Sequence, residues 1–84
     1  MGATLLQPLF HFTSARRRRL EETLLSWLKW GAAPEVAKAL KIHPQTVRYR
    51  MRQIDKIFGA AIRDPDTRFV LELALRDRLD SAVQ

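Results

Sequence analysis

Two short helical patterns separated by three residues constrain the fold of this chain more than any other feature of its sequence. A proline stands where the first turn of each helix is expected, a position that suits a residue without a backbone N–H. The residues of the two patterns are Pro34 with Val36, Ala37 and Leu40, then Pro44 with Val47, Met51, Ile54 and Phe58, ending at Gly59. Lys41, Ile42 and His43 leave room only for a tight turn, in which Ile42 would fill the angle between the helices. The pattern predicts a helix-turn-helix over about residues 34–58.

The rest of the chain also reads as helix, and no alternating strand pattern of useful length occurs. A helix is predicted from Ser14, as N-cap, to Trp30, with Gly31 ending it. Its apolar stripe consists of Leu20, Leu24, Trp27 and Leu28, while Trp30 would cover the helix end. We therefore expect an all-α fold, a small bundle of about four to five helices.

The first fifteen residues carry an apolar segment interrupted by Pro8, in which Leu5, Leu6, Leu9 and Phe10 have helical spacing. We expect one or two helical turns there. Residues 1–15 are read as an N-terminal segment that contributes to the core, is a remnant of a linker, or makes a dimer contact. Residues 16–84 are read as the helix-turn-helix domain.

The last helix is predicted to begin after Asp64 as N-cap, with Pro65 at its first position. Its expected core face consists of Phe69, Val70, Leu73 and Leu79, widened by Leu71 and Leu75. So broad an apolar stripe indicates a helix that is deeply buried or that lends part of its surface to another subunit.

Charge favours an anionic partner. The 84 residues carry a net charge of +6. Residues 34–58 hold six basic side chains against two acidic ones, +4, whereas the other 59 residues carry only +2. The charge is thus concentrated on the predicted motif, as expected for a nucleic-acid-binding domain.

Enzymatic chemistry finds no support in the sequence. There is no cysteine, the two histidines His11 and His43 lack carboxylate partners at ligand spacing, and three glycines form no phosphate-binding loop. We expect no metal, no cofactor and no catalytic activity. No apolar run could span a membrane and no signal peptide is visible, so we expect a cytoplasmic protein without a membrane partner.

The arginines of the second helix do not share one role. At about 100° per residue, the apolar residues cluster on one side, with Gln45, Tyr49, Arg52 and Lys56 opposite. Arg48 and Gln53 flank this outer face, and Arg50 lies nearest the core boundary, where its stem can pack while its head reaches solvent. The residues expected to contact DNA are His43, Gln45, Thr46, Arg48, Tyr49, Arg50, Arg52 and Lys56.

Within this set, Gln45, Thr46, Arg48 and Tyr49 occupy the first two turns and are the candidates for reading bases in the major groove. Arg52 and Lys56 are better placed for phosphates. His43 could contact a phosphate or simply cap the helix, and Tyr49 could be a peripheral core residue. Alternating arginines alone could equally be a solvated face.

Two other basic positions have competing interpretations. Lys41 stands where such turns often place glycine, so a left-handed conformation, costing roughly 1 kcal/mol, is favoured over a phosphate contact. The run Arg16 to Arg19 could clamp the DNA backbone or merely solubilise the first helix, and the second role is favoured.

Three motifs in order, "LEETLLSWLKWG", "VAKALKIHPQTVRYRMRQIDKIFG" and "DPDTRFVLELAL", resemble the C-terminal helix-turn-helix domain of the PucR/CdaR family of bacterial transcriptional regulators. The resemblance covers about Leu20 to Leu79. The family commonly has Arg-Asn after the turn histidine, where this chain has Pro44-Gln45, so the sequence it reads should differ from that of better-known members.

This resemblance implies a DNA-binding output domain at the end of a longer regulator, whose N-terminal sensor domain is absent from this chain. It further implies binding to double-stranded operator DNA as a homodimer, in response to small metabolites such as purine-catabolic intermediates or sugar diacids. The alternative is a helical protein-interaction or dimerisation module with incidental positive charge, and the focus of charge on the motif favours DNA. RNA binding is a weaker variant, since no aromatic stacking surface is evident.

Overall fold

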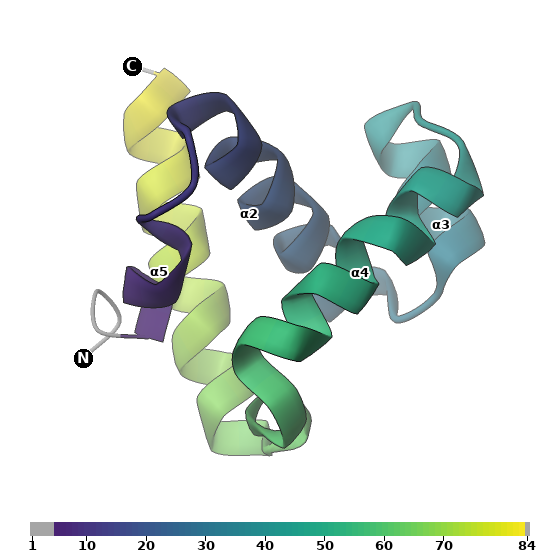
Figure 1. Cartoon of the computed structure of the whole chain (residues 1–84). Helices are drawn as coiled ribbons and strands as arrows, with labels where there is room; N and C mark the ends of the chain where they lie inside the picture. Colours follow the sequence, from purple (N-terminus) through teal and green to yellow (C-terminus); the bar gives the residue numbers. More distant parts are fainter. Residues whose placement is uncertain (1–4, 84) are drawn as a thin grey trace.

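A computed structural model describes residues 5–83, which form helices throughout with no strand (Figure 1). The predicted all-α bundle is therefore confirmed for this part of the chain. Its elements are the 3₁₀ helix η1 (Gln7–Leu9), the α-helices α2 (Ser14–Trp30), α3 (Ala33–Leu40) and α4 (Pro44–Phe58), the 3₁₀ helix η2 (Gly59–Arg63), and α5 (Pro65–Val83).

The helix α2 is the centre of the bundle, because it contacts α3, α4 and α5. In Figure 1, α5 lies on one side of α2 and the α3–α4 pair on the other. The fully buried apolar side chains come from every part of this arrangement and form one cluster: Leu6, Leu9, Leu24, Val36, Val47, Ile54, Leu71 and Leu75. The helix-turn-helix thus rests on a core that it shares with the rest of the domain.

The ends of α2 follow ordinary capping chemistry with one correction to the sequence analysis. The N-cap is Thr13, whose side chain accepts a hydrogen bond from the backbone N–H of Arg16 at 3.2 Å, whereas Ser14 is already the first helical residue. The prediction of Ser14 as N-cap was wrong by one position. Gly31 ends the helix as predicted, with a left-handed φ of 73°.

The apolar segment before α2 belongs to the core. Pro8 lies inside η1, a single 3₁₀ turn of the kind expected there, and Leu6 and Leu9 are completely buried. Phe10 is partly exposed and lies against the guanidinium groups of Arg17 and Arg78, at 5.4 and 5.0 Å from ring centroid to Cζ. This segment therefore closes the side of the bundle formed by α2 and α5.

The core face of α5 differs from the prediction. Leu71 and Leu75, expected only to widen the stripe, are the fully buried pair, whereas Phe69 and Leu73 are 62% and 52% exposed. Apolar residues surround this helix on most sides, so their periodicity does not select one face. The face turned inward is the one that also brings Arg78, seven residues after Leu71, to α2.

That contact is an ion pair between the two helices. Arg78 Nε donates to Glu21 Oε2 at 2.6 Å, and the side chain of Glu21 is only 3% exposed. Burial of an ionised carboxylate is costly unless the carboxylate is paired and hydrogen-bonded, and Arg78 supplies both interactions. The pair consequently fixes α5 against α2. No helix of the described residues is long and apolar enough to cross a membrane.

Candidate nucleic-acid interface

The turn between α3 and α4 is closed by backbone hydrogen bonds. Lys41 has a left-handed φ of 59°, as expected. Its N–H donates to the carbonyl of Lys38, and the N–H of Ile42 donates to that of Ala37 at 3.0 Å. Ile42 is half-buried and packs against the core, in the angle between the helices. The predicted helix-turn-helix is confirmed, although α3 begins at Ala33, one residue before Pro34.

The start of α4 is capped by His43. Its Nδ1 accepts a hydrogen bond from the backbone N–H of Gln45 at 3.0 Å. In the neutral ring this leaves the hydrogen on Nε2, which can donate outward. No acidic residue occupies the first turn, so the positive end of the helix dipole is not neutralised. Capping by His43 and an interaction with an external anion are therefore compatible.

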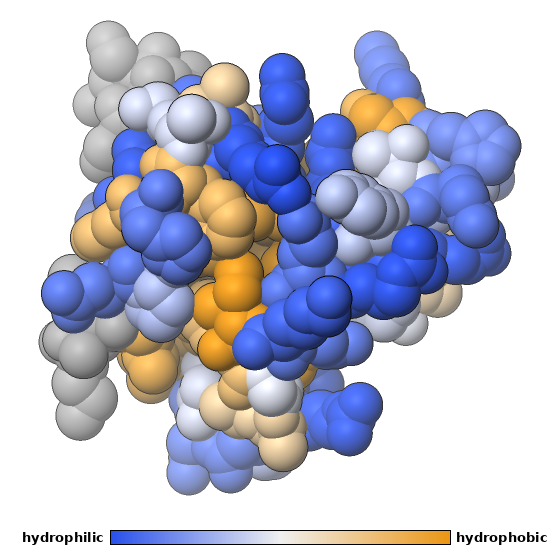
Figure 2. Space-filling view, viewed as in Figure 1, coloured by the Kyte–Doolittle hydropathy of each residue, from blue (hydrophilic) through white to orange (hydrophobic). Residues whose placement is uncertain are grey.

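The two faces of α4 have the chemistry predicted from the helical repeat. Val47, Met51 and Ile54 are buried in the core. On the opposite face Tyr49 is 52% exposed, and the other exposed side chains are Gln45, Arg48, Arg52 and Lys56. Hydrophilic residues cover α4 along its length, whereas more hydrophobic surface lies towards η1 and α5 (Figure 2). The helix consequently offers a polar, basic outer face on an apolar support.

Gln45 and Arg48 hold each other on this outer face. Arg48 Nη1 donates to Gln45 Oε1 at 2.9 Å, across one helical turn. The hydrogen bond leaves the amide nitrogen of Gln45 and most N–H groups of Arg48 available to another molecule. Two of the four side chains expected to read bases are therefore presented as a pair.

Arg50 and Thr46 lie at the edge of the face and not at its centre. Both are half-buried. Arg50 Nη1 donates to Oγ1 of Thr23 on α2 at 3.2 Å, and that hydroxyl donates in turn to the carbonyl of Arg19 at 2.8 Å. The head of Arg50 is thus bonded to α2, although the sequence analysis expected it to reach solvent.

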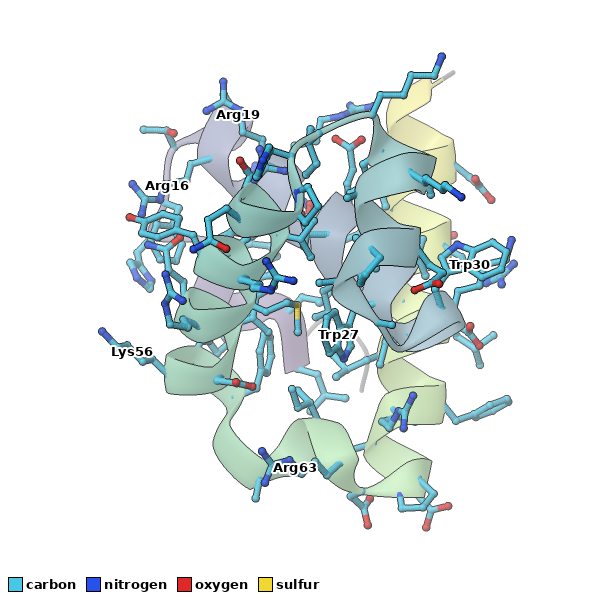
Figure 3. All side chains as sticks on the ribbon, turned by 90° about the vertical axis from the view of Figure 1, so that its right-hand side faces the viewer. Arg16, Arg19, Trp27, Trp30, Lys56 and Arg63 are labelled. Carbon is cyan, nitrogen blue, oxygen red and sulfur yellow. The ribbon has the colours of Figure 1, made fainter. Side chains whose placement is uncertain are left out.

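Arginines of α2 border one flank of the outer face. Arg16 and Arg19 line a hollow of about 240 Å³ together with Thr46, Tyr49 and Arg50. Figure 3 shows Arg16 and Arg19 on the same side of the molecule as Lys56, with Trp30 on the opposite side. Of the two other arginines of the run, Arg18 pairs with Glu22 of α2, and Arg17 lies against Phe10 of the segment before α2.

Sequence reasoning missed the arginines on the other flank. Arg63 of η2 and Arg68 of α5 line a second hollow with Arg48, Arg52 and Asp55 of α4. They follow the helix-turn-helix in the sequence and come beside α4 only because the chain reverses at Gly59, whose φ is 60°. When charge was counted by sequence region, these two arginines fell outside residues 34–58 and were counted with the rest of the chain. The sequence feature that could have drawn attention to them is that they flank Asp64, the predicted cap of the last helix.

Among residues 5–83 no group of three or more histidine, cysteine, aspartate or glutamate side chains gathers as a metal site requires. The geometry is instead that of a helix-turn-helix domain with a basic second helix bordered by arginines on both flanks. The chain belongs to the family of the PucR C-terminal helix-turn-helix domain, which it matches over residues 20–76. The predicted resemblance is confirmed.

The chain is also similar to the purine catabolism regulatory protein of Bacillus subtilis (strain 168). The two are 43% identical over 42 residues, which make up 50% of this chain and 8% of that protein. The similarity thus spans a small part of the relative's length. No solved structure matches the chain.

Proposed function

We propose that this domain is the sequence-specific DNA-binding output domain of a bacterial transcriptional regulator, with α4 as the recognition helix in the major groove. The observation that carries the proposal is the division of α4 into a buried apolar face and an exposed polar face whose first two turns hold Gln45, Arg48 and Tyr49. Its family and the printed name of its relative support a role in transcription regulation. It would act in the bacterial cytoplasm, where operator DNA lies, by binding and not by catalysis.

The chemistry of the face supports base reading near the start of α4 and phosphate binding further along. Arg48 can bond the two acceptors of guanine and Gln45 those of adenine, while the methyl of Thr46 can meet that of thymine. Arg52 and Lys56 lie in later turns, where a backbone approaches. His43 can donate from Nε2 to a phosphate while its Nδ1 caps the helix.

The test of this proposal is a fluorescence-anisotropy titration with promoter fragments from the neighbourhood of the regulator's gene, compared with random duplex. Arg48→Ala should reduce the preference for the best fragment about 5- to 150-fold, as expected for loss of one bidentate base contact. The matched control is Arg76→Ala, which removes an arginine paired with Glu72 on α5. Equal binding to all fragments, unchanged by Arg48→Ala, would contradict the proposal.

The full regulator is proposed to bind operator DNA as a homodimer, with a sensor domain preceding this one. Two recognition helices would then enter successive major grooves about 34 Å apart on a palindromic site. The exposed Phe69 and Leu73 of α5, one helical turn apart, support a contact with another subunit, since adjoining exposed apolar side chains can form part of an interaction site. The stoichiometry of the titration on one and on two half-sites tests this arrangement.

The same two side chains favour a second candidate function, a helical protein-interaction module with incidental charge. That function requires no preference among DNA fragments and no loss on substitution of Arg48. The titration therefore separates the two candidates directly.

A further inference from the structure

A basic hollow of about 400 Å³ lies between the recognition helix and the segment that follows it. Three elements supply its charged walls, and Trp27 of α2 forms part of its apolar floor. Figure 3 labels Trp27 and Arg63. The charged side chains that line the hollow are Arg48, Arg52 and Asp55 of α4, Arg63 of η2 and Arg68 of α5.

The positive charge of this hollow is compensated only in part by its own lining. Four guanidinium groups face one carboxylate, and among the described residues none of the four forms an ion pair. Asp64, next to Arg63 in the chain, is engaged as the cap of α5 and accepts two hydrogen bonds from Thr67. Like charges over an apolar floor repel one another, and an anion that enters would relieve this repulsion.

The position of the hollow suits one particular anion. It adjoins the outer face of α4 on the side of Arg48 and Arg52, while Arg16 and Arg19 border the other side beside Tyr49. A major groove about 12 Å wide accepts one helix and is bounded by a phosphate backbone on each side. With α4 in the groove, the two flanks of the helix would therefore meet the two strands.

We propose that the hollow between α4 and α5 binds the phosphodiester backbone of the duplex, with Arg63 and Arg68 donating to its phosphates from outside the helix-turn-helix. This inference rests on the proposed function and adds to it a contact with the backbone of one DNA strand. Guanidinium groups suit the task because their paired N–H donors match two phosphate oxygens. The contact would position the recognition helix without reading sequence.

The first test measures the salt dependence of DNA binding for wild type and for Arg63→Gln/Arg68→Gln. Each lost phosphate contact lowers the slope of log affinity against log salt concentration by about 0.9, so the double variant should lose about 2 units. Its preference for the best fragment over random duplex should remain. The matched control is Arg18→Gln/Arg76→Gln, which removes the same charge from exposed arginines paired with Glu22 and Glu72.

The second test locates the phosphate. Neutral methylphosphonates are introduced one at a time along each strand of the best fragment. One or two positions on a single strand should weaken binding by wild type but not by Arg63→Gln/Arg68→Gln, because the variant has already lost the partner. Arg18→Gln/Arg76→Gln should respond to these positions as wild type does.

The possible outcomes separate the inference from the proposed function. If wild type binds with sequence preference and both double variants keep the same slope, the inference is wrong and the proposed function stands. If the Arg63 and Arg68 variant loses preference and keeps its slope, the hollow reads bases, which also contradicts the inference. If wild type does not bind duplex DNA, both fail.

A further measurement distinguishes binding of a free anion in the hollow from binding of the DNA backbone. The melting temperature of the protein is compared in inorganic phosphate and in chloride at the same ionic strength. Stabilisation of wild type by phosphate, lost in Arg63→Gln/Arg68→Gln while the slope on DNA is unchanged, would reassign the hollow to a free anion and overturn the inference.

Discussion

A single lysine carries the sharpest local strain in the helix-turn-helix. Lys41 has a φ of 59°, a region that costs a residue with a Cβ about 1 kcal/mol and costs glycine nothing. The conformation is required because the hydrogen bonds that end α3 and turn the chain into α4 depend on it. The turn therefore holds Lys41 in a backbone conformation that glycine would adopt without this cost.

We predict that Lys41→Gly is more stable than Lys41→Ala by about 1 kcal/mol. Both variants lose the same charge, so their difference isolates the Cβ. Urea denaturation followed by circular dichroism measures it. In α3 the same comparison at Lys38 should have the opposite sign, because glycine weakens a helix interior. Equal stability of the two Lys41 variants would show that the turn is not strained.

At this scale, local chemistry was predictable and cross-helix chemistry was not. The Asp64 cap and the left-handed Lys41 follow from neighbouring residues. Thr13 was missed because two hydroxyl residues stand side by side and either can cap. The bond from Arg50 to Thr23 joins residues 27 positions apart and depends on how α2 and α4 cross, which no periodicity encodes.

Among the elements, α4 and α5 differ in how well their sequences define a face. In α4 the apolar residues form one narrow stripe, so rotation of about 100° per residue identified the buried and exposed sides correctly. In α5 the apolar residues are spread around the helix, and the expected face placed Phe69 and Leu73 inside. The orientation of α5 about its own axis is instead set by the packing of Leu71 and Leu75 against the core and by the contact of Arg78 with α2.

The cap at the start of α5 predicts how the stability of the domain depends on pH. Hydrogen bonds from the backbone N–H and then the hydroxyl of Thr67 hold the pKa of Asp64 below its ordinary value of 3.8. A lowered pKa in the folded state contributes stability above the unfolded value, and this contribution is lost as pH falls through the folded value. Wild type should therefore lose stability relative to Asp64→Asn as pH falls from above the ordinary carboxyl pKa of 3.8 through the lower folded-state pKa.

Denaturant unfolding at several pH values measures this difference, since asparagine still caps the helix but does not titrate. Asp66→Asn, a change within the first turn and not at the cap, is the control. A stability difference between wild type and Asp64→Asn that does not vary with pH would contradict the prediction.

In the molecule as a whole, the ion pair between Glu21 and Arg78 joins the helix at the centre to the last one. Arg78→Met should destabilise the fold by about 2 kcal/mol, less than for a fully buried pair because the arginine side chain is 35% exposed. Replacing both residues by leucine and methionine, Glu21→Leu/Arg78→Met, should cost less than the sum of the single changes.

Denaturant unfolding of wild type, Glu21→Leu, Arg78→Met and the double variant gives the free energy of unfolding of each protein. The departure of these four values from additivity is the coupling energy between Glu21 and Arg78. Additive changes would mean that the pair contributes nothing beyond its separate side chains. Neither this pair nor the basic hollow beside α4 could be predicted from the sequence, because each brings together helices that are distant in the chain.

The hydrogen-bonded turn before α4 has a consequence for how such a domain can acquire a new target. Because the core side of α4 and the closed turn fix the helix, the residues on its outer side form an exchangeable set that folding does not constrain. If α4 reads DNA as proposed, operator preference could be reprogrammed by transplanting a relative's outer residues without rebuilding the domain. Gln45 and Arg48 would have to be transplanted together, since each holds the other in position.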